Sequence, residues 1–341
     1  MIPIFAVLYT IGLPDTPLFL YLRLSYIIAG LLILKLKEPY LKESPYQAGW
    51  WSIFLIFSFY ILLGGFYGNP TTGSLWSMQY LYFALIPAAI LYLIREDAIK
   101  KIFQWVLVVC VALSLFSIPY LTGGFIMTRF SIGQATINFA RFYALGVLLA
   151  LFYGLSRKKL YFFALALLLF LFLVLTGTRG ALVSLLVAFI FFVLFFWKGK
   201  KLARLGVTVG ILALMFLVLL LAPGLGKYRI LLTSVVNTSV QQRLYMWQDA
   251  INVFFANPVF GAGTGGFGKN MSQFFVNAYP HNIFLEIGSE HGIIGLAFFL
   301  LMLFMVIKYG IRLYRASGVN RQFVGLIFSL LVFSLSNAMF S

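Results

Sequence analysis

The chain alternates between long apolar stretches and short polar ones. A run of about twenty apolar residues is long enough to cross a bilayer as a helix. On this pattern we expect helices near 1–13, 17–34, 46–64, 75–94, 101–118, 140–156, 160–176, 180–197, 204–222, 291–308 and 322–340. The sequence therefore predicts an all-α, polytopic transmembrane helix bundle of about 11–12 spans.

One polar segment is far longer than the others. It runs from Pro223 to Glu290, between two predicted spans. A connection of that length in a compact protein usually carries function or a structure of its own. We therefore divide the chain into transmembrane helices at 1–222, a large, partly helical loop at 223–290, and C-terminal transmembrane helices at 291–341.

Within the large loop, Gln241 to Ala256 has the spacing of an amphipathic helix, which Asn257-Pro258 ends. The residues expected on its apolar face are Leu244, Trp247, Ile251, Phe254 and Phe255. Two compatible interpretations stay open. The helix either lies in the membrane interface or forms a roof over a cavity.

The glycine-rich stretch Gly261 to Gly266 fits the G-x-G-x-x-G pattern of dinucleotide sites. No strand is expected before it and no βαβ unit surrounds it, so we exclude a dinucleotide site. The chain also lacks the phosphate loop used for ATP. Glycines in this number instead predict turns whose backbone closely approaches a ligand or another helix.

Composition agrees with a membrane protein. Hydrophobic residues make up 62% and charged residues 10%, against about 45–50% and about 25% in soluble domains. The net charge of +17 would suit a nucleic-acid partner. However, if residue 1 is cytoplasmic, 17 of the 25 basic residues fall in predicted inner loops. Charge therefore encodes orientation by the positive-inside rule; it predicts no nucleic-acid partner and puts the large loop outside.

The large loop closes with Tyr279-Pro280-His281-Asn282, which contains one of only two histidines. Since Pro280 suits a helix start, we expect His281 in the first turn of a helix entering the membrane. Partial positive charge there disfavours imidazolium, and a neutral ring accepts a proton as a general base must. The alternative is an interfacial histidine with a local hydrogen bond. His291, beside Gly292, is expected at a helix terminus.

Acidic residues are few, eight in all. Glu286 and Glu290 are one helical turn apart and near both histidines, so a metal site is conceivable. The characteristic zinc spacings are absent. We therefore expect metal-independent chemistry without a cofactor.

Three arginines are expected on the same outer side as His281. Arg179 lies at the outer end of a helical hairpin, Arg141 begins another span, and Arg243 lies on the amphipathic helix. Each alone is equally explained as a snorkelling or surface charge. Together, with few carboxylates to pair with, their guanidinium groups predict an anionic ligand that carries phosphate. A lipid pyrophosphate is such a ligand, and as an activated donor it needs no ATP outside the cell.

Three sequence blocks fall on this outer side. They are Leu175-Thr176-Gly177-Thr178-Arg179-Gly180-Ala181-Leu182, then Arg243-x-x-Met246-Trp247-x-x-Ala250 with Asn257-Pro258-x-x-Gly261-x-Gly263, and finally His281-Asn282-x-Phe284-Leu285-Glu286-x-Gly288-x-x-x-Gly292-x-x-Gly295. In order and placement, over roughly residues 140–310, they resemble the O-antigen ligase and polymerase superfamily of bacterial envelope glycan enzymes, most of all O-antigen ligase.

The resemblance implies a GT-C type glycosyltransferase in the bacterial inner membrane, among membrane lipids, with an active site that faces the periplasm beneath the large loop. The donor would be a glycan on undecaprenyl pyrophosphate. His281 would assist attack by the acceptor hydroxyl. Arg179 and Arg243, joined by Arg141, would hold the pyrophosphate as leaving group. Asn282 and Glu286 would support the site. Direct attack would invert the anomeric configuration.

Several functions stay open at this point. A ligase transfers the glycan to lipid A–core, a polymerase to another lipid-linked repeat, and a related group to protein; the histidine in the large loop favours the ligase. A transporter or flippase would need polar groups at mid-membrane and broken helices near the bilayer centre, whereas these charges cluster outside. Asp15 as the base of a conventional polyprenol-sugar transferase is more simply a turn residue.

Overall fold

The computed structural model describes residues 45–68, 73, 96–122, 136–197, 200–221, 233–270, 279–316 and 320–340. Every regular element within these ranges is a helix, and none is a strand. The all-α prediction is therefore confirmed. The expected spans at 1–13, 17–34 and 75–94, together with Asp15, lie outside the described residues.

The expected spans recur as helices. They are α3 (Pro45–Tyr67), α6 (Glu96–Thr122), α7 (Thr136–Arg157), α8 (Leu160–Leu175), α9 (Arg179–Phe195), α10 (Lys201–Leu221), α14 (Ile283–Arg315) and α15 (Arg321–Phe340). Among the described residues, five helices are long and apolar enough to cross a membrane: α3, α7, α10, α14 and α15. The protein is thus a multi-pass membrane protein.

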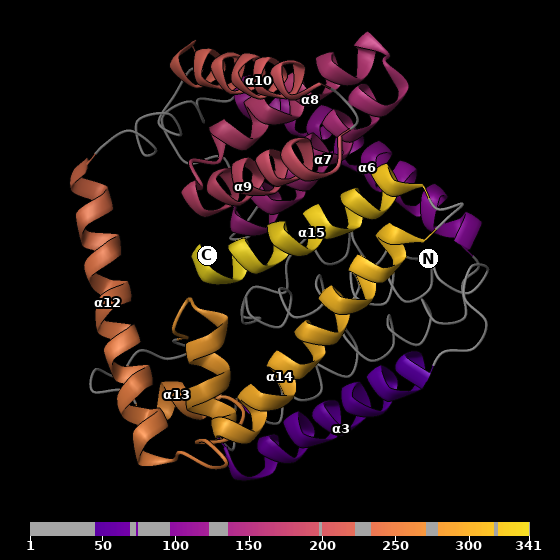
Figure 1. Cartoon of the computed structure of the whole chain (residues 1–341). Coiled ribbons are helices and arrows are strands. Elements are labelled where there is room, and N and C mark those ends of the chain that lie inside the picture. Colours follow the sequence, from indigo (N-terminus) through magenta and orange to yellow (C-terminus); the bar gives the residue numbers. More distant parts are fainter. Residues whose placement is uncertain are drawn as a thin grey trace. The chain divides into compact units, whose positions relative to one another are not determined.

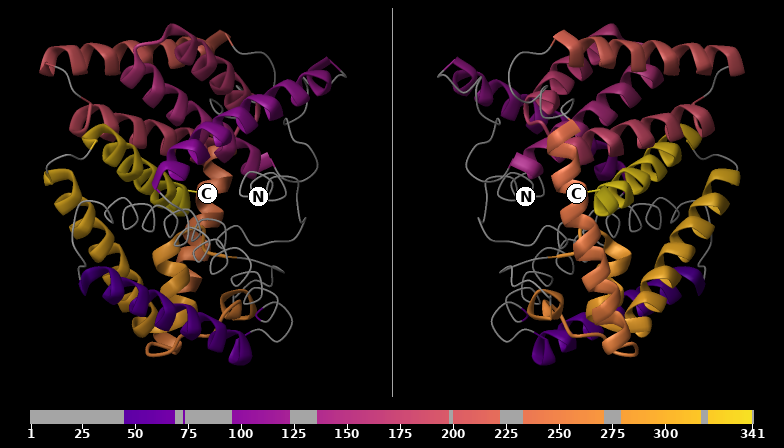
Figure 2. Two further views of the ribbon diagram at one scale, coloured as in Figure 1. Left: turned by 90° about the vertical axis from the view of Figure 1, so that its right-hand side faces the viewer. Right: turned by 90° about the vertical axis from the view of Figure 1, so that its left-hand side faces the viewer.

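The chain divides into two compact units. Unit 1 consists of residues 1–14, 95–235 and 320–341 and contains α6 to α10 and α15 (Figures 1 and 2). Its interior is formed by α7 and α15, whose spans are 83% and 78% buried, whereas α10 is only 11% buried and lies at the edge. Close packing of α15 on the end of α9 needs Gly325, where a Cβ atom would overlap the side chain of Phe196.

Unit 2 consists of residues 15–94 and 236–319. It contains α3, nearly all of α12 (Thr233–Ala256), the short α13 (Gly266–Lys269) and α14. Helices α3 and α14 pack against each other (Figures 1 and 2). A small core joins α12, α13 and the start of α14. It consists of Ala250 and Val253 from α12 and Phe267 from α13, with Leu285 of α14 packed against them.

Helix α14 begins at Ile283, eight residues before the span predicted at 291–308. The side chain of Asn282 caps it by accepting hydrogen bonds from the backbone N–H groups of Phe284 and Leu285. At Gly292 the backbone leaves the helix, with φ 62° and ψ −163°, a combination that essentially only glycine adopts. The helix therefore changes direction there (Figure 1). Polar residues before the bend lower the hydropathy and conceal this first segment from a search for apolar runs.

Helix α12 begins at Thr233, eight residues before the predicted Gln241, and ends at Ala256, before Asn257-Pro258 as predicted. Ala250 and Val253 are buried, while Leu244, Ile251 and Phe255 of the expected face are exposed. Small side chains permit close packing on α13, and the large apolar ones remain outside. Exposed leucine, isoleucine and phenylalanine suit a helix in contact with lipid.

Candidate functional site

The bend in α14 is closed by the glycine-rich segment. Breaking the helical ladder frees backbone groups on both sides of Gly292, and buried backbone groups need partners. The N–H groups of Ala262 and Gly263 donate to the carbonyls of Ser289 and Glu290, at 2.9 and 2.8 Å. On the other side, Ile293 N–H donates to Pro258 O at 2.8 Å. Residues 258–263 thus supply the hydrogen bonds that the helix loses at the bend.

The glycines in this segment allow backbone to touch backbone. Gly261 and Gly263 have φ 74° and 81°, the left-handed region that glycine adopts without strain. A Cβ atom on Gly261 would overlap the peptide between Glu290 and His291, and one on Gly263 would overlap Gly68. The expectation of close approach to another helix is confirmed, and the G-x-G-x-x-G pattern here serves helix packing.

Helix α3 fastens the same region from its own side. The Tyr60 hydroxyl lies 3.0 Å from His291 O and 3.1 Å from Phe260 O, and the Tyr67 hydroxyl donates to Phe260 O at 3.2 Å. Thr264 donates through its hydroxyl to Ile61 O at 2.8 Å. Sequence reasoning missed these residues because about two hundred positions separate the partners and no motif links them.

His291 is fully buried at the bend. It is the last residue before the non-helical Gly292, and its ring lies 5.9 Å from that of Tyr60. This agrees with the expectation of a histidine at a helix terminus.

His281 lies just outside α14, two residues before its first residue. The expectation that it lies in the first helical turn is therefore wrong, because Asn282 is the better capping residue and takes that position. The backbone of His281 has φ 54°, unusual for a residue other than glycine. Its ring is half-buried with a buried Nδ1 atom and lies 4.2 Å from the Tyr279 ring. Strained backbone of this kind is concentrated at functional sites.

Trp247 connects the His281 segment to α12. Its indole Nε1–H donates to Pro280 O at 2.8 Å, directly before His281. Arg243 is four residues earlier on α12, and residues four apart lie on one face of a helix. Arg243 is half-buried, on the same side as Met246 and Ala250. Arg243 therefore lies one helical turn from the residue that binds the His281 segment. The sequence blocks contained Trp247, yet nothing in them revealed this bond.

Two carboxylates are buried in the first segment of α14. Glu286 is 2% and Glu290 1% exposed. Glu286 lies in the first turn, where a negative charge is favoured by the helix dipole. Within the described ranges, no three His, Cys, Asp or Glu side chains gather in a way that would hold a metal ion.

Unit 1 holds the other two arginines. Arg179 is the first residue of α9, after a tight turn in which Gly177 has φ 65°. The Thr176 hydroxyl fixes the turn, since it donates to Leu173 O at 2.7 Å and accepts from Thr178 N–H at 3.3 Å. A cation at a helix N-terminus adds to the positive end of the dipole, and the free N–H groups there favour an anion.

Arg141 lies at the same end of unit 1 as Arg179. Helices α7 and α8 run antiparallel through a short connection, and Tyr143 of α7 contacts Phe172 of α8 with ring centroids 5.5 Å apart. Arg141 therefore lies beside the turn that leads into α9. Both arginines are half-buried with buried Nε atoms. Two guanidinium groups and a helix N-terminus together give this end of unit 1 a strongly positive character.

Residues 163–300 match the family model described as O-antigen ligase. This match supports a relation to the O-antigen ligase and polymerase superfamily. That family implies a glycosyltransferase-type enzyme that acts on a lipid-linked glycan in a membrane. No curated protein and no solved structure gives a significant match to the chain.

The superfamily segment extends over both units. Arg179 lies in its unit 1 portion, Arg243 and His281 in its unit 2 portion, and Arg141 precedes it. Arg141 and Arg179 lie at the same end of unit 1, and Arg243 lies one helical turn before Trp247, whose indole binds Pro280. That all four groups act on one ligand stays a prediction.

Proposed function

We propose that this protein is an O-antigen ligase. It transfers a glycan from undecaprenyl pyrophosphate to a lipid A–core acceptor on the periplasmic face of the bacterial inner membrane. The observation that supports it most is the hydrogen bond from Trp247 to Pro280. This bond ties the strained His281 segment to α12 one helical turn from Arg243, which supports a base that works beside a phosphate-binding arginine.

In the proposed reaction, an acceptor hydroxyl oxygen attacks the anomeric carbon of the donor sugar. The bond between that carbon and the pyrophosphate oxygen breaks, and its electron pair leaves with undecaprenyl pyrophosphate. The neutral ring of His281 takes the hydroxyl proton as the new glycosidic bond forms. One displacement inverts the anomeric configuration.

Negative charge grows on the pyrophosphate as the bond breaks. Arg179 and Arg243, with Arg141, bind its oxygens, and preplaced guanidinium groups stabilise that charge more in the transition state than in the ground state. The N-terminal N–H groups of α9 add to the same effect. Because cationic side chains do this work, the proposed reaction needs neither a metal ion nor a cofactor.

Asn282 and Glu286 support the site indirectly. Asn282 caps α14 and so fixes where the helix ends and the His281 segment begins. Glu286, buried in the first turn, stabilises the start of the same helix through the dipole. Neither is proposed to touch the reacting atoms.

The test is a transfer assay with the purified, reconstituted protein. It receives a lipid-linked glycan together with lipid A–core and, in a separate arm, with a second lipid-linked repeat. The expected products are glycosylated lipid A–core with an inverted linkage and undecaprenyl pyrophosphate in equal amounts, at a rate that chelator leaves unchanged. Growth of lipid-linked chains with unmodified core would identify a polymerase instead, and activity that chelator removes and a divalent ion restores would refute the metal-independent mechanism.

A further inference from the structure

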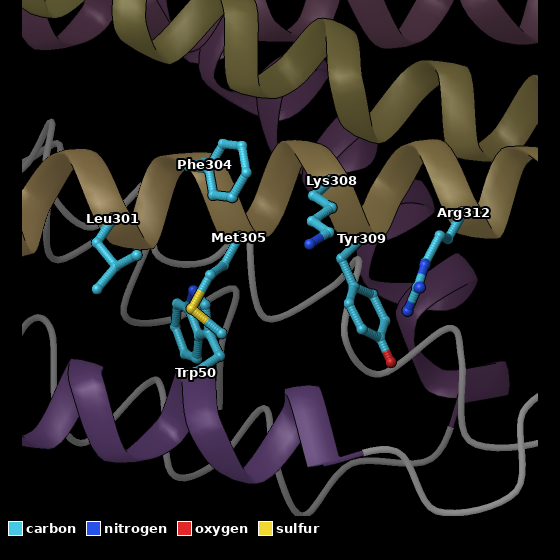
Figure 3. Close-up of a pocket in the computed structure, with 7 residues that line it drawn as sticks. All are labelled: Trp50, Leu301, Phe304, Met305, Lys308, Tyr309 and Arg312. Carbon is cyan, nitrogen blue, oxygen red and sulfur yellow. The ribbon is translucent and has the colours of Figure 1, made fainter.

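A small pocket lies between α3 and the second segment of α14, within unit 2 and away from the His281 segment. Figure 3 shows Met305 of α14 meeting Trp50 of α3, with Lys308, Tyr309 and Arg312 on the same side further along α14. The lining residues are Trp50, Leu301, Phe304, Met305, Lys308, Tyr309 and Arg312. Nothing in the proposed transfer reaction uses this pocket.

One end of the pocket is hydrocarbon. Leu301 and Phe304 are 42% and 58% exposed on a helix that is apolar enough to cross a membrane. Trp50 forms a buried wall opposite them, stacked on Phe54 of its own helix. Exposed side chains of this kind on a spanning helix face acyl chains.

The other end of the pocket is cationic. Phe304, Lys308 and Arg312 follow one another at intervals of four residues, so they form a single row along α14. The Lys308 ammonium lies 5.6 Å from the centroid of the Phe304 ring, and none of the seven lining residues is acidic. From Phe304 to Arg312 the helix rises about 12 Å. The pocket is thus apolar at one end and positively charged at the other. The distance between the two ends is about that spanned by the glycerol and phosphate of a lipid.

The indole of Trp50 adds a hydrogen-bond donor. Its Nε1 atom is buried and has no acceptor among the described residues, although buried indole N–H groups usually have one. The ring nitrogen lies on the side that faces α14, next to Met305 (Figure 3). Methionine is flexible enough to move aside, which would open the N–H to an ester or phosphate oxygen.

We propose that this pocket binds one anionic phospholipid of the surrounding bilayer. The phosphate lies on Lys308 and Arg312, and an acyl chain runs along Leu301 and Phe304 against Trp50. Basic pockets between transmembrane helices favour anionic head groups, and these two cations lie at the end of α14 that the charge distribution assigns to the cytoplasmic side. The lipid stabilises the pairing of α3 with α14, the two helices that enclose the bend.

The experiment measures lipid binding by native mass spectrometry of the full-length protein in mild detergent. Phosphatidylglycerol is titrated against phosphatidylcholine with the same acyl chains. Arg312→Ala and Lys308→Ala are compared with Arg315→Ala, a matched control one turn further along, which is exposed and does not line the pocket. We expect phosphatidylglycerol to be preferred, and each pocket variant to weaken its binding about fivefold, while Arg315→Ala changes it less than twofold.

Three outcomes would overturn the proposal. They are equal binding of the two lipids, an equal loss in Arg315→Ala, and displacement of the lipid by millimolar inorganic phosphate, which would make the ligand a soluble anion. Thermal unfolding of every variant, measured with and without phosphatidylglycerol, separates lost binding from lost folding. Phosphatidylglycerol should raise the thermal unfolding midpoint of the native protein and of Arg315→Ala. It should raise the midpoint of Arg312→Ala much less.

Discussion

The two pairs of candidate site residues are built in different ways. In unit 1, Arg179 begins α9 after a short turn, and Arg141 lies in the second turn of α7. In unit 2, His281 has a left-handed backbone, α14 bends at Gly292, and distant segments close the bend through backbone hydrogen bonds. The first region is simple and local, whereas the second depends on contacts between segments far apart in the chain.

This difference fits what each region is proposed to do. Holding a phosphate requires positive charges on a rigid support, and guanidinium groups tolerate some variation in the position of their helix because each has several donors. Moving a proton requires a base within hydrogen-bonding reach of one hydroxyl. A strained His281, tied through Pro280 to Trp247, gives the more exact placement.

The largest effect is expected from His281→Asn. Asparagine tolerates the left-handed backbone but cannot act as a base, so the protein should fold while kcat falls about 10²- to 10⁴-fold. Transfer by the reconstituted variant and its thermal midpoint measure the two parts separately. A near-native kcat would show that His281 is not the base.

The bend in unit 2 is tested by Gly292→Ala. Only glycine suits this backbone, at a cost for alanine of about 1–3 kcal/mol, and the new Cβ would also overlap Val259 O. We expect a lower free energy of unfolding and a large loss of transfer. Gly288→Ala is the matched control, because it lies one turn earlier in regular helix with its nearest contact, Phe254, at 3.6 Å. Equal behaviour of the two variants would contradict a structural role for the bend.

A smaller effect is expected from Trp247→Phe, which keeps an aromatic ring but removes the N–H donor to Pro280. Loss of one hydrogen bond is worth about 1 kcal/mol, or roughly a fivefold fall in kcat. Because Trp247 positions His281 and does not bind donor, KM for the lipid-linked glycan should remain unchanged. A rise in KM at constant kcat would assign Trp247 to donor binding instead.

The smallest effect is expected from Asn282→Ala. It removes the cap of α14 and should lower the free energy of unfolding by about 1 kcal/mol, with a modest loss of transfer. Asn282→Ser retains a capping oxygen and should restore both. If alanine and serine behave alike in chemical denaturation, capping is not the role of this side chain.

Sequence periodicity predicted most of unit 1, because its helices are apolar runs with short connections. The span predicted at 291–308 omits the first segment of α14 because Glu286, Ser289, Glu290 and His291 make that segment too polar for a search based on hydropathy. A helix start was nevertheless expected beside Pro280. The N-cap of α14 was not assigned, and this misplaced His281 by two residues.

The large apolar residues of α12 were identified from the sequence, which left open whether they face lipid or protein. In a membrane protein they also face lipid, and here Ala250 and Val253 make the close contacts. The bonds of Tyr60 and Trp247 to distant carbonyls have no local signal. The glycine-rich stretch Gly261 to Gly266 predicted a close backbone contact, but it did not indicate which segment the backbone contacts.

The central claim is that Arg179 and Arg243 bind one pyrophosphate. A double-mutant cycle of Arg179→Ala and Arg243→Ala tests it, and kcat/KM for the lipid-linked glycan is the readout. In the control cycle, Arg157→Ala replaces Arg179→Ala, because Arg157 is exposed at the far end of α7. If both arginines bind one leaving group, their effects should be non-additive by about 0.5–3 kcal/mol, while the control cycle is additive. Strict additivity of Arg179 and Arg243 would contradict the account.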